Sequence, residues 1–369
     1  MSRLAIEDFR SYDVAELTLT PGITALVGPN GSGKTNLLEA LHLLSRGSSP
    51  RAREEFELIR WGAAVSRIAA DSEREGERTR VEIVLVAPVP GERRRPRRHL
   101  VDGAPKRADE ALGRIVVVAF FPEDVELLSD APSARRRYLD EMIEQVDRRH
   151  AADGRDYQRV VAQRNALLRA MRDEGAPREE EIAFWDGELC RLAAAISLRR
   201  MRAVHELRAP FRDAVERWSG EHVIDVAYAT PAEGEDEATR ESAYRRLLSE
   251  KRDREMWQAA TLVGPHREDL AVRSQGRDLP AFASRGEHRS VVLALKLAEA
   301  EWLRSRTGTT PVFLLDDVLS ELDAERRQRL IHALPLDSQA LITSALSAGL
   351  PADLGASARL VRVERGRIA

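Results

Sequence analysis

Apolar and polar positions follow two different patterns along this chain. Both ends contain short alternating or continuous apolar runs, which are typical of strands. In the first part, strands are expected at residues 4–7, 13–19, 23–27, 66–70, 80–86, 99–101 and 114–120, and a leucine-rich helix at 36–44. In the last part, helices are expected at 293–303 and 323–334, and buried strands at 311–315 and 339–343.

The middle of the chain has a helical pattern, from about residue 133 to about residue 257. Apolar residues step by three and four positions from Ile182 to Ile196, which is the spacing of a coiled-coil seam. The sequence Gly-Ala-Pro at 175–177 predicts a hairpin between two helices, and Pro210 is expected to kink or break the second one. The acidic stretch 231–237 is expected to be an exposed loop.

These patterns predict an α/β fold that is split by a mostly helical insertion. We expect one head made of residues 1–130 and 259–369, with residues 131–258 forming a short arm that resembles a coiled-coil hairpin.

Composition restricts the classes of function. With 43% hydrophobic and 32% charged residues, the 369-residue chain has the composition of a soluble globular protein. It has no run of eighteen apolar residues and no signal-peptide core, so a cytoplasmic location is expected. The single Cys190 excludes an intrachain disulfide and is expected to be a core residue, and the eight scattered histidines do not suggest zinc.

A phosphate-binding loop follows the strand at 23–27. Residues 28–35 match the pattern G-x-x-x-x-G-K-[ST]. Only four of the 58 Lys and Arg residues are lysines, and Lys34 stands where a compact ammonium fits between crowded phosphate oxygens. We expect Lys34 to bridge the β- and γ-phosphates and the Thr35 hydroxyl to bind Mg²⁺. The alternative is an ordinary glycine-rich turn before a helix.

An acidic partner for this loop lies at the end of the strand at 311–315. We expect Asp316 to hold Mg²⁺ through water and Asp317 to orient or deprotonate the attacking water. Farther upstream, Ser284 and Glu287 have the spacing of a helix capping box, which is a purely structural account. The functional account uses the same helix start, with Ser284 and Gly286, as an anion site.

Six blocks, spread over the chain in a fixed order, carry a family resemblance: residues 28–40, 121–127, 132–140, 264–269, 284–289 and 314–323. Together they resemble the heads of ABC-type ATPases in the branch related to SMC chromosome proteins, and within it the RecF family of bacterial recombinational repair ATPases. The fold that this implies is an ABC/SMC-type P-loop ATPase head with an inserted helical arm.

The resemblance implies a site and a mode of action. It implies catalytic roles for Lys34, Asp316 and Asp317, and it implies that Thr35 and Asp316 bind Mg²⁺. ATP contacts fall on Gly28, Pro29, Asn30, Gly31, Ser32, Gly33, Lys34, Thr35, Asn36, Ser284 and Gly286. ATP is expected to join two copies of the chain, with Ser284 reaching the γ-phosphate held by the other copy. The dimer is expected to bind gapped or duplex DNA and, with RecO and RecR, to assist the loading of RecA.

Several positions depart from the general ABC pattern. The signature reads Ser-Arg-Gly-Glu at 284–287 instead of Ser-Gly-Gly-Gln, and Asp317 replaces a longer glutamate. Thr343 or Ser344 stands in the slot of the switch histidine, and residues 122–124 stand where a magnesium-coordinating glutamine is usual. These departures favour a slow ATPase that uses ATP as a switch.

Other functions fit these features less well. An ABC transporter subunit should have the loop glutamine and the switch histidine and should lack the long insertion. An SMC chromosome protein needs hundreds of coiled-coil residues, and a small-molecule kinase does not account for residues 284–289 or for the split head. Candidate DNA contacts are the arginine clusters at 93–98 and 135–137. The first can equally be a solvated turn, and the second can pair with Asp140 and Glu141.

Overall fold

The computed structural model describes residues 1–74, 76–89, 91, 97–175, 178–219, 224–281, 283–320, 322–335, 337–345 and 358–368. The chain divides into two compact units. Unit 1 contains Met1–Val125, Arg217–Gly220 and Arg289–Ala369, and unit 2 contains Glu126–Glu216 and Glu221–His288. The return to unit 1 thus comes 30 residues after the boundary that we expected at 258/259, because residues 259–288 include strands that pair inside unit 2.

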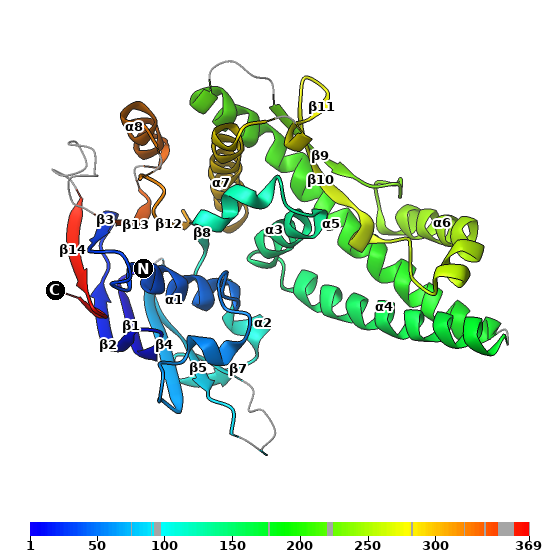
Figure 1. Ribbon diagram of the computed structural model, residues 1–369, viewed down its shortest axis with the longest axis horizontal. Coiled ribbons are helices and arrows are strands. Elements are labelled where there is room, and N and C mark those ends of the chain that lie inside the picture. Colours follow the sequence, from blue (N-terminus) through cyan, green and yellow to red (C-terminus); the bar gives the residue numbers. More distant parts are fainter. Residues whose placement is uncertain are drawn as a thin grey trace. The chain divides into compact units, whose positions relative to one another are not determined.

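A largely parallel sheet forms one layer of unit 1 (Figure 1). Its strands in spatial order are β15 (Arg367–Ile368), β14 (Arg359–Glu364), β3 (Gly22–Val27), β13 (Gln339–Ser344), β12 (Val312–Leu315) and β8 (Val117–Phe120). All neighbours are parallel except β15, which pairs with β14 in an antiparallel hairpin. Strand β8 begins three residues later than the expected 114–120, and β14 and β15 lie in a segment where no strand was expected.

An antiparallel sheet forms a second layer of unit 1. Its strands in spatial order are β2 (Tyr12–Thr18), β1 (Arg3–Phe9), β4 (Val65–Arg74), β5 (Glu77–Val86), β6 (Arg98–Val101) and β7 (Ala104–Lys106). The expected run of strands from 66 to 101 is therefore a meander.

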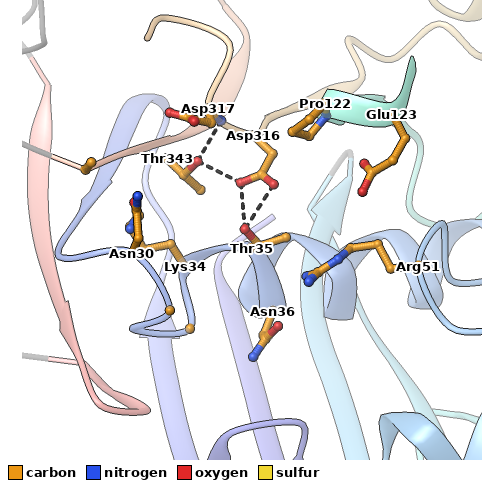
Figure 2. A pocket seen from close by; sticks show the side chains of 13 residues that line it. Asn30, Lys34, Thr35, Asn36, Arg51, Pro122, Glu123, Asp316, Asp317 and Thr343 are labelled. Atoms are coloured by element: carbon orange, nitrogen blue, oxygen red, sulfur yellow. Dashed lines mark hydrogen bonds between the residues drawn. The ribbon is translucent and has the colours of Figure 1, made fainter. Parts of the chain in front are cut away.

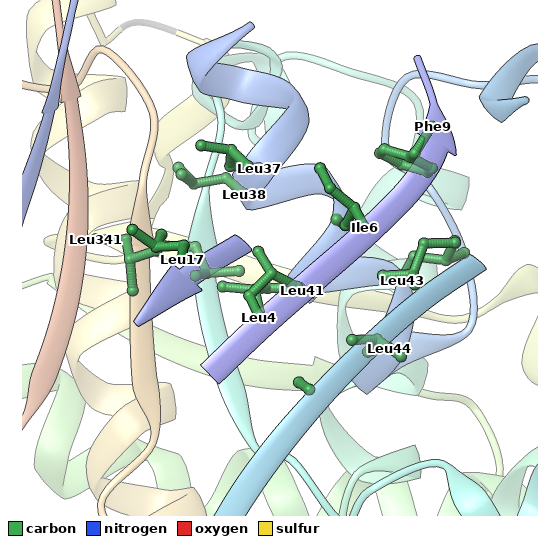
Figure 3. Close-up of a cluster of buried hydrophobic side chains, with 14 of the residues drawn as sticks. Leu4, Ile6, Phe9, Leu17, Leu37, Leu38, Leu41, Leu43, Leu44 and Leu341 are labelled. Carbon is green, nitrogen blue, oxygen red and sulfur yellow. The ribbon is translucent and has the colours of Figure 1, made fainter. Parts of the chain in front are cut away.

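Helix α1 (Lys34–Arg46) contacts strands of both sheets, and this explains its composition. A helix covered on two sides needs apolar residues nearly all round. Its leucines pack against Leu4, Ile6 and Phe9 of β1 on one side and Leu341 of β13 on the other (Figure 3). The helix that carries the phosphate-binding loop is therefore anchored in the core of unit 1.

Shorter helices and α7 complete the unit 1 part of the chain. They are η1 (Glu55–Leu58), α2 (Ala108–Ala111), η2 (Pro122–Leu127), α7 (Arg285–Thr307) and α8 (Ala324–Ala333). Helices η2 and α7 each run across a boundary between the units. Helix α7 begins well before the expected residue 293.

Unit 2 consists of helices and one small sheet. The helices are α3 (Pro132–Glu144), α4 (Arg148–Glu174), α5 (Glu179–Ser219) and α6 (Glu237–Gln258), with short turns η3 (Pro265–Arg267) and η4 (Leu279–Ala281). The sheet has the order β11 (Arg277–Asp278), β10 (Asp269–Ser274) and β9 (Ile224–Ala229). We had not expected β9, whose alternating pattern lies inside a region that otherwise reads as helical.

The stripe of apolar residues on α5 is buried as expected, but its setting differs from a two-helix rod. Leu189, Leu192 and Ile196 share one cluster with Tyr157 of α4 and Tyr244 of α6, so a third helix covers the seam. Cys190 lies in the same cluster, and burial raises the pKa of its thiol to about 12.

Helix α5 continues through Pro210, so of the expected kink or break the break is wrong. A proline removes one backbone donor, and the tertiary packing of the other residues can retain the helix. Of the expected hairpin, residues 176–177 lie outside the described part of the chain. The acidic stretch forms the expected loop up to Asp236, which caps α6. None of the described helices is long and apolar enough to cross a bilayer.

Candidate ATP site

The order of the parallel sheet brings four loops to one edge. Strands β3, β13, β12 and β8 are neighbours and parallel, so their carboxyl ends all meet there. The phosphate-binding loop follows β3, Asp316 follows β12, Thr343 is the last but one residue of β13, and Pro122 follows β8 shortly after. Ligand sites of open parallel sheets form at this edge.

Asp316 is the centre of the polar contacts at this edge (Figure 2). The Thr35 hydroxyl lies 2.9 Å from each carboxylate oxygen, and the Thr343 hydroxyl donates to Oδ1 over 2.7 Å. The Thr343 oxygen in turn accepts the backbone N–H of Asp317 over 2.8 Å. One threonine therefore holds both the Asp316 carboxylate and the backbone of Asp317.

The charge state of Asp316 follows from its surroundings. It is only 5% exposed, and burial raises the pKa of its carboxyl above the ordinary value. Hydrogen bonds from Thr343 and Thr35 and the positive charge of Arg51 oppose this effect without cancelling it. A buried carboxylate with a raised pKa is stabilised by any cation that enters the site.

Lys34 points into the same region from the start of α1. Its ammonium donates to the carbonyl oxygens of Gly28 and Pro29 at 2.7 and 2.9 Å. Burial lowers its pKa, while the carboxylates of Asp316 and Asp317 raise it again in part. These carbonyl bonds hold the loop around the ammonium, and phosphate oxygens are stronger acceptors for the same donor.

Asp317 has a different setting from Asp316. Its side chain is exposed, and its backbone has a φ of 49°, in the left-handed region that few non-glycine residues adopt. This conformation turns the chain sharply after β12 and places Asp317 beside the same cavity.

A cavity of about 470 Å³ opens between these loops. It is lined by Asn30, Gly31, Gly33, Lys34, Thr35, Asn36, Arg51, Pro122, Glu123, Asp316, Asp317, Thr343 and Ala345. The oxygen atoms of Thr35 and Asp316 are hard ligands of the kind that Mg²⁺ prefers, so this donor set fits magnesium. The described residues contain no cluster of three or more His, Cys, Asp or Glu that could hold a metal alone. A magnesium ion here would need water and phosphate oxygens as further ligands.

The remaining predicted residues lie outside this lining. Gly28, Pro29 and Ser32 form the back of the loop, where the Ser32 side chain is buried. Ser284 and Gly286 belong to unit 2 and are exposed at the start of α7. The Ser284 N–H donates to Glu287 over 2.7 Å and the Glu287 N–H to the Ser284 hydroxyl over 3.3 Å. The capping box therefore exists, and it leaves this helix start facing solvent.

Sequence reasoning missed Arg51 entirely. Its side chain is exposed at the cavity, opposite Glu123 in Figure 2. No motif marks it, since arginine is by far the commonest cation of this chain. At the place of the usual glutamine, Pro122 and Glu123 line the cavity, whereas Asp124 turns back to accept the N–H of Phe121 over 2.8 Å.

Most of the arginine cluster at 135–137 makes contacts within the chain. Arg135 is buried and bidentate to Asp269 at 2.9 and 2.7 Å, and Arg136 donates to the carbonyl of Glu268. Arg137 is exposed, 4.0 Å from Glu141. Of this cluster, only Arg137 offers its charge to solvent. Most of the other candidate, residues 93–96 of the cluster at 93–98, lies outside the described part of the chain.

Comparison with known sequences gives a consistent result. The family model described as RecF/RecN/SMC N terminal domain matches residues 1–366. A protein of Roseiflexus castenholzii called DNA replication and repair protein RecF is 38% identical, and the alignment covers 100% of this chain and 99% of the relative. A protein of the same description from Acidothermus cellulolyticus is 39% identical over 94% of both chains.

Solved structures agree with this. The chain is similar to the recombination mediator protein RecF with ATP, with a TM-score of 0.89 and 28% identity over 100% of this chain and 96% of the other. It is also similar in fold to an Smc head bound to the C-winged helix domain of ScpA, with a TM-score of 0.57 and 16% identity over 100% and 95% of the chains. The expected fold, an SMC-type ATPase head with a mostly helical insertion, is confirmed.

Proposed function

Because the chain belongs to the RecF family within the RecF/RecN/SMC group, we propose that it is an ATP-dependent DNA clamp of recombinational repair and replication restart. Its relatives are DNA replication and repair proteins, and a solved relative binds ATP. The observation that carries the proposal is the convergence of Lys34, Thr35, Asp316 and Thr343 on one cavity.

The arrangement supports a division of labour in ATP binding. Amides of the loop and the start of α1 face the phosphates, and Lys34 exchanges its two carbonyl partners for phosphate oxygens. Thr35 and Asp316 hold Mg²⁺, which supplies charge neutralisation for the phosphates. The Thr35 hydroxyl can turn its lone pairs outward, because a hydroxyl both donates and accepts. Thr343 then keeps Asp316 in place.

Hydrolysis depends on Asp317. Its exposed carboxylate lies beside the cavity and its backbone is fixed by Thr343, so it is placed to orient the attacking water. Aspartate is one methylene shorter than the glutamate usual in transporters, which favours slow turnover, and DNA is expected to stimulate it. ATP then acts as a switch between open and closed clamps.

Closure requires a second copy of the chain. Ser284 and Gly286 are exposed at a helix start, where backbone amides and the helix dipole favour an anion. In the dimer, each copy contributes its loop to one ATP and its Ser284 to the other, so ATP binding and dimerisation are coupled. The dimer holds gapped or junction DNA by phosphate contacts and cooperates with RecR and RecO in loading RecA.

A mixture of two inactive variants tests the shared site. Ser284→Arg keeps its own loop but blocks the second copy, and Lys34→Met removes ATP binding while keeping a good helix start. Each alone should be inactive in DNA-stimulated ATP hydrolysis, and mixing should restore part of the activity, since one site of the heterodimer is intact.

Sedimentation with ATP verifies that heterodimers form in the mixture. Absence of both hydrolysis and single-site ATP trapping in such heterodimers would contradict the shared site. Wild-type protein that stays monomeric with ATP and DNA would contradict the clamp itself.

A further inference from the structure

The last strand of unit 1 lies directly against the phosphate-binding loop. Strand β14 pairs with β3 in parallel, with Val361 beside Leu26 and Arg362 beside Val27. Val363 therefore continues past the end of β3, next to Gly28. A Cβ on Gly28 would lie 2.0 Å from the Val363 carbonyl oxygen, which is too close for any other residue. The loop thus needs glycine at 28 because of β14, not because of the nucleotide alone.

The turn between β14 and β15 contacts the loop a second time. It consists of Arg365 and Gly366, with φ of 48° and 73°. The Gly366 N–H donates to the Ser32 carbonyl over 2.9 Å. On its other side, a Cβ on Gly366 would lie 2.3 Å from the carbonyl oxygen of Ser11. The turn therefore packs closely between the phosphate-binding loop and the β1–β2 turn.

The β1–β2 turn is itself tied to the site. The Ser11 hydroxyl accepts the side-chain N–H of Asn36, in the first turn of α1, over 2.9 Å. A displacement of Gly366 would therefore act on the loop directly, through Ser32, and on the start of α1 through Ser11. These contacts are made within unit 1 alone.

We propose that Gly366 is a positioning residue for ATP, which holds the phosphate-binding loop in its binding conformation through Ser32 and Ser11. The inference rests on the proposed function, since it assigns a role in ATP binding. A loop that is ordered before the ligand arrives loses less conformational entropy on binding, so its affinity is higher. The triphosphate itself never touches Gly366.

The chain contains a matched control for this contact. Asp102 and Gly103 form a turn between β6 and β7 with nearly the same angles, φ of 51° and 77°. A Cβ on Gly103 would meet no atom within 4 Å. Alanine therefore meets similar left-handed strain at both positions, but only at Gly366 does it push on a neighbour.

The experiment compares Gly366→Ala with Gly103→Ala in the full-length protein. Titration calorimetry with ATP and Mg²⁺ should give a Kd at least 10-fold higher for Gly366→Ala and within two-fold of wild type for Gly103→Ala. In hydrolysis, KM should rise for Gly366→Ala while kcat stays within two-fold, because bound ATP orders the loop again. Equal affinities for the two variants would overturn the proposal.

Amide hydrogen exchange of the wild-type protein covers the case in which Gly366→Ala does not fold. The Gly366 amide should exchange at least 10-fold more slowly than the Gly103 amide, and ATP with Mg²⁺ should slow it further. Equal exchange of the two amides contradicts the contact. Wild-type protein that does not bind ATP contradicts the proposed function, and the exchange of its unliganded form still tests the contact to Ser32.

Discussion

Two buried carboxylates of this protein have nearly equal exposure and opposite surroundings. Asp316 of unit 1 is 5% exposed and Glu268 of unit 2 is 2% exposed. The partners of Asp316 are two threonine hydroxyls, and a cavity of about 470 Å³ lies beside it. Glu268 accepts hydrogen bonds from three hydroxyls, those of Tyr228, Thr230 and Tyr244, at the centre of unit 2.

An ion pair between α5 and α3 lies next to the hydroxyl partners of Glu268. Arg200 is bidentate to Asp140 at 2.7 and 2.8 Å and donates to the Pro265 carbonyl over 2.8 Å. Burial alone would raise the pKa of Asp140, but the hydrogen bond from His150 and the charge of Arg200 lower it below its ordinary value. The segment 264–269 is thus tied to α3 and α5 by side chains whose charges are balanced.

The difference separates a structural cluster from a functional one. A buried charge with enough donors holds elements together and has no need of a ligand. The pKa of Asp316 is raised and the residue borders open space, so its best partner is a cation from solution. Burial of an acidic side chain does not by itself mark a functional site. A buried acidic side chain whose pKa stays raised and which borders a cavity does mark one.

The largest effect is expected from Lys34→Met, which should weaken ATP binding at least about 100-fold, because charge-assisted hydrogen bonds to phosphate are lost. The fold should be retained, since the ammonium faces only the loop carbonyls. Titration with ATP measures the effect, and Lys106→Met, which removes the same charge from β7, is the control. An affinity within a few-fold of wild type would contradict the assignment of the loop.

In the cluster around Glu268 (the closed cluster), Glu268→Gln should lower the free energy of unfolding by about 1.5–3 kcal/mol, which is what hydrogen bonds to a charged acceptor contribute. An amide offers one acceptor oxygen where the carboxylate offers two. The control Glu241→Gln breaks a partly exposed pair with Arg245, 2.6 Å long, and should cost less than about 1 kcal/mol. Denaturant unfolding distinguishes the two. An ATP affinity lowered by Glu268→Gln as strongly as by Lys34→Met would show that the two clusters do not have separate roles.

The cluster around Asp316, beside the cavity, was predictable because each of its parts belongs to a local sequence pattern. The loop joins a strand to a helix, and Asp316 ends a strand, so the parallel topology brings them together. The sequence left Thr343 and Ser344 as alternatives near Asp316, and in the folded unit the Thr343 hydroxyl donates to Asp316. Arg51 could not be predicted, because its position depends on the path of the chain after α1.

No local sequence pattern marked the cluster around Glu268. Tyr228, Tyr244 and Glu268 come from β9, α6 and the segment before β10, and their side chains meet only in the folded unit. Residues 264–269 were part of the family resemblance, but the sequence alone assigned them no structural role. The expected arm boundary at 258 failed to include them because β10 pairs with β9, a long-range contact that propensity does not encode.

The smallest effect concerns stability at Asp316 itself. Asp316→Asn should increase the stability of the unliganded protein by about 0.5–2 kcal/mol, because it removes a charge that burial disfavours. The same variant should bind ATP with Mg²⁺ more weakly than wild type, since an amide is a poorer magnesium ligand. Thermal unfolding with and without ATP and Mg²⁺ should therefore reverse the order of the two proteins.

The pH dependence of this gain gives a sharper form of the test. The pKa of Asp316 is raised above 3.8 in the folded state, so the folded state binds the proton more tightly than the unfolded state. Wild type therefore loses stability relative to Asp316→Asn as pH rises from about 3.8 through the folded pKa, and the gap is constant above it. Asp337 is the control, because the hydrogen bond from Thr310 lowers its pKa, so the gap between wild type and Asp337→Asn should have the opposite slope below about pH 3.8 and stay flat above it. If the gap between wild type and Asp316→Asn stays flat or shrinks between about pH 4 and pH 8, the Asp316 carboxylate is already compensated. The contrast between the two clusters would then fail.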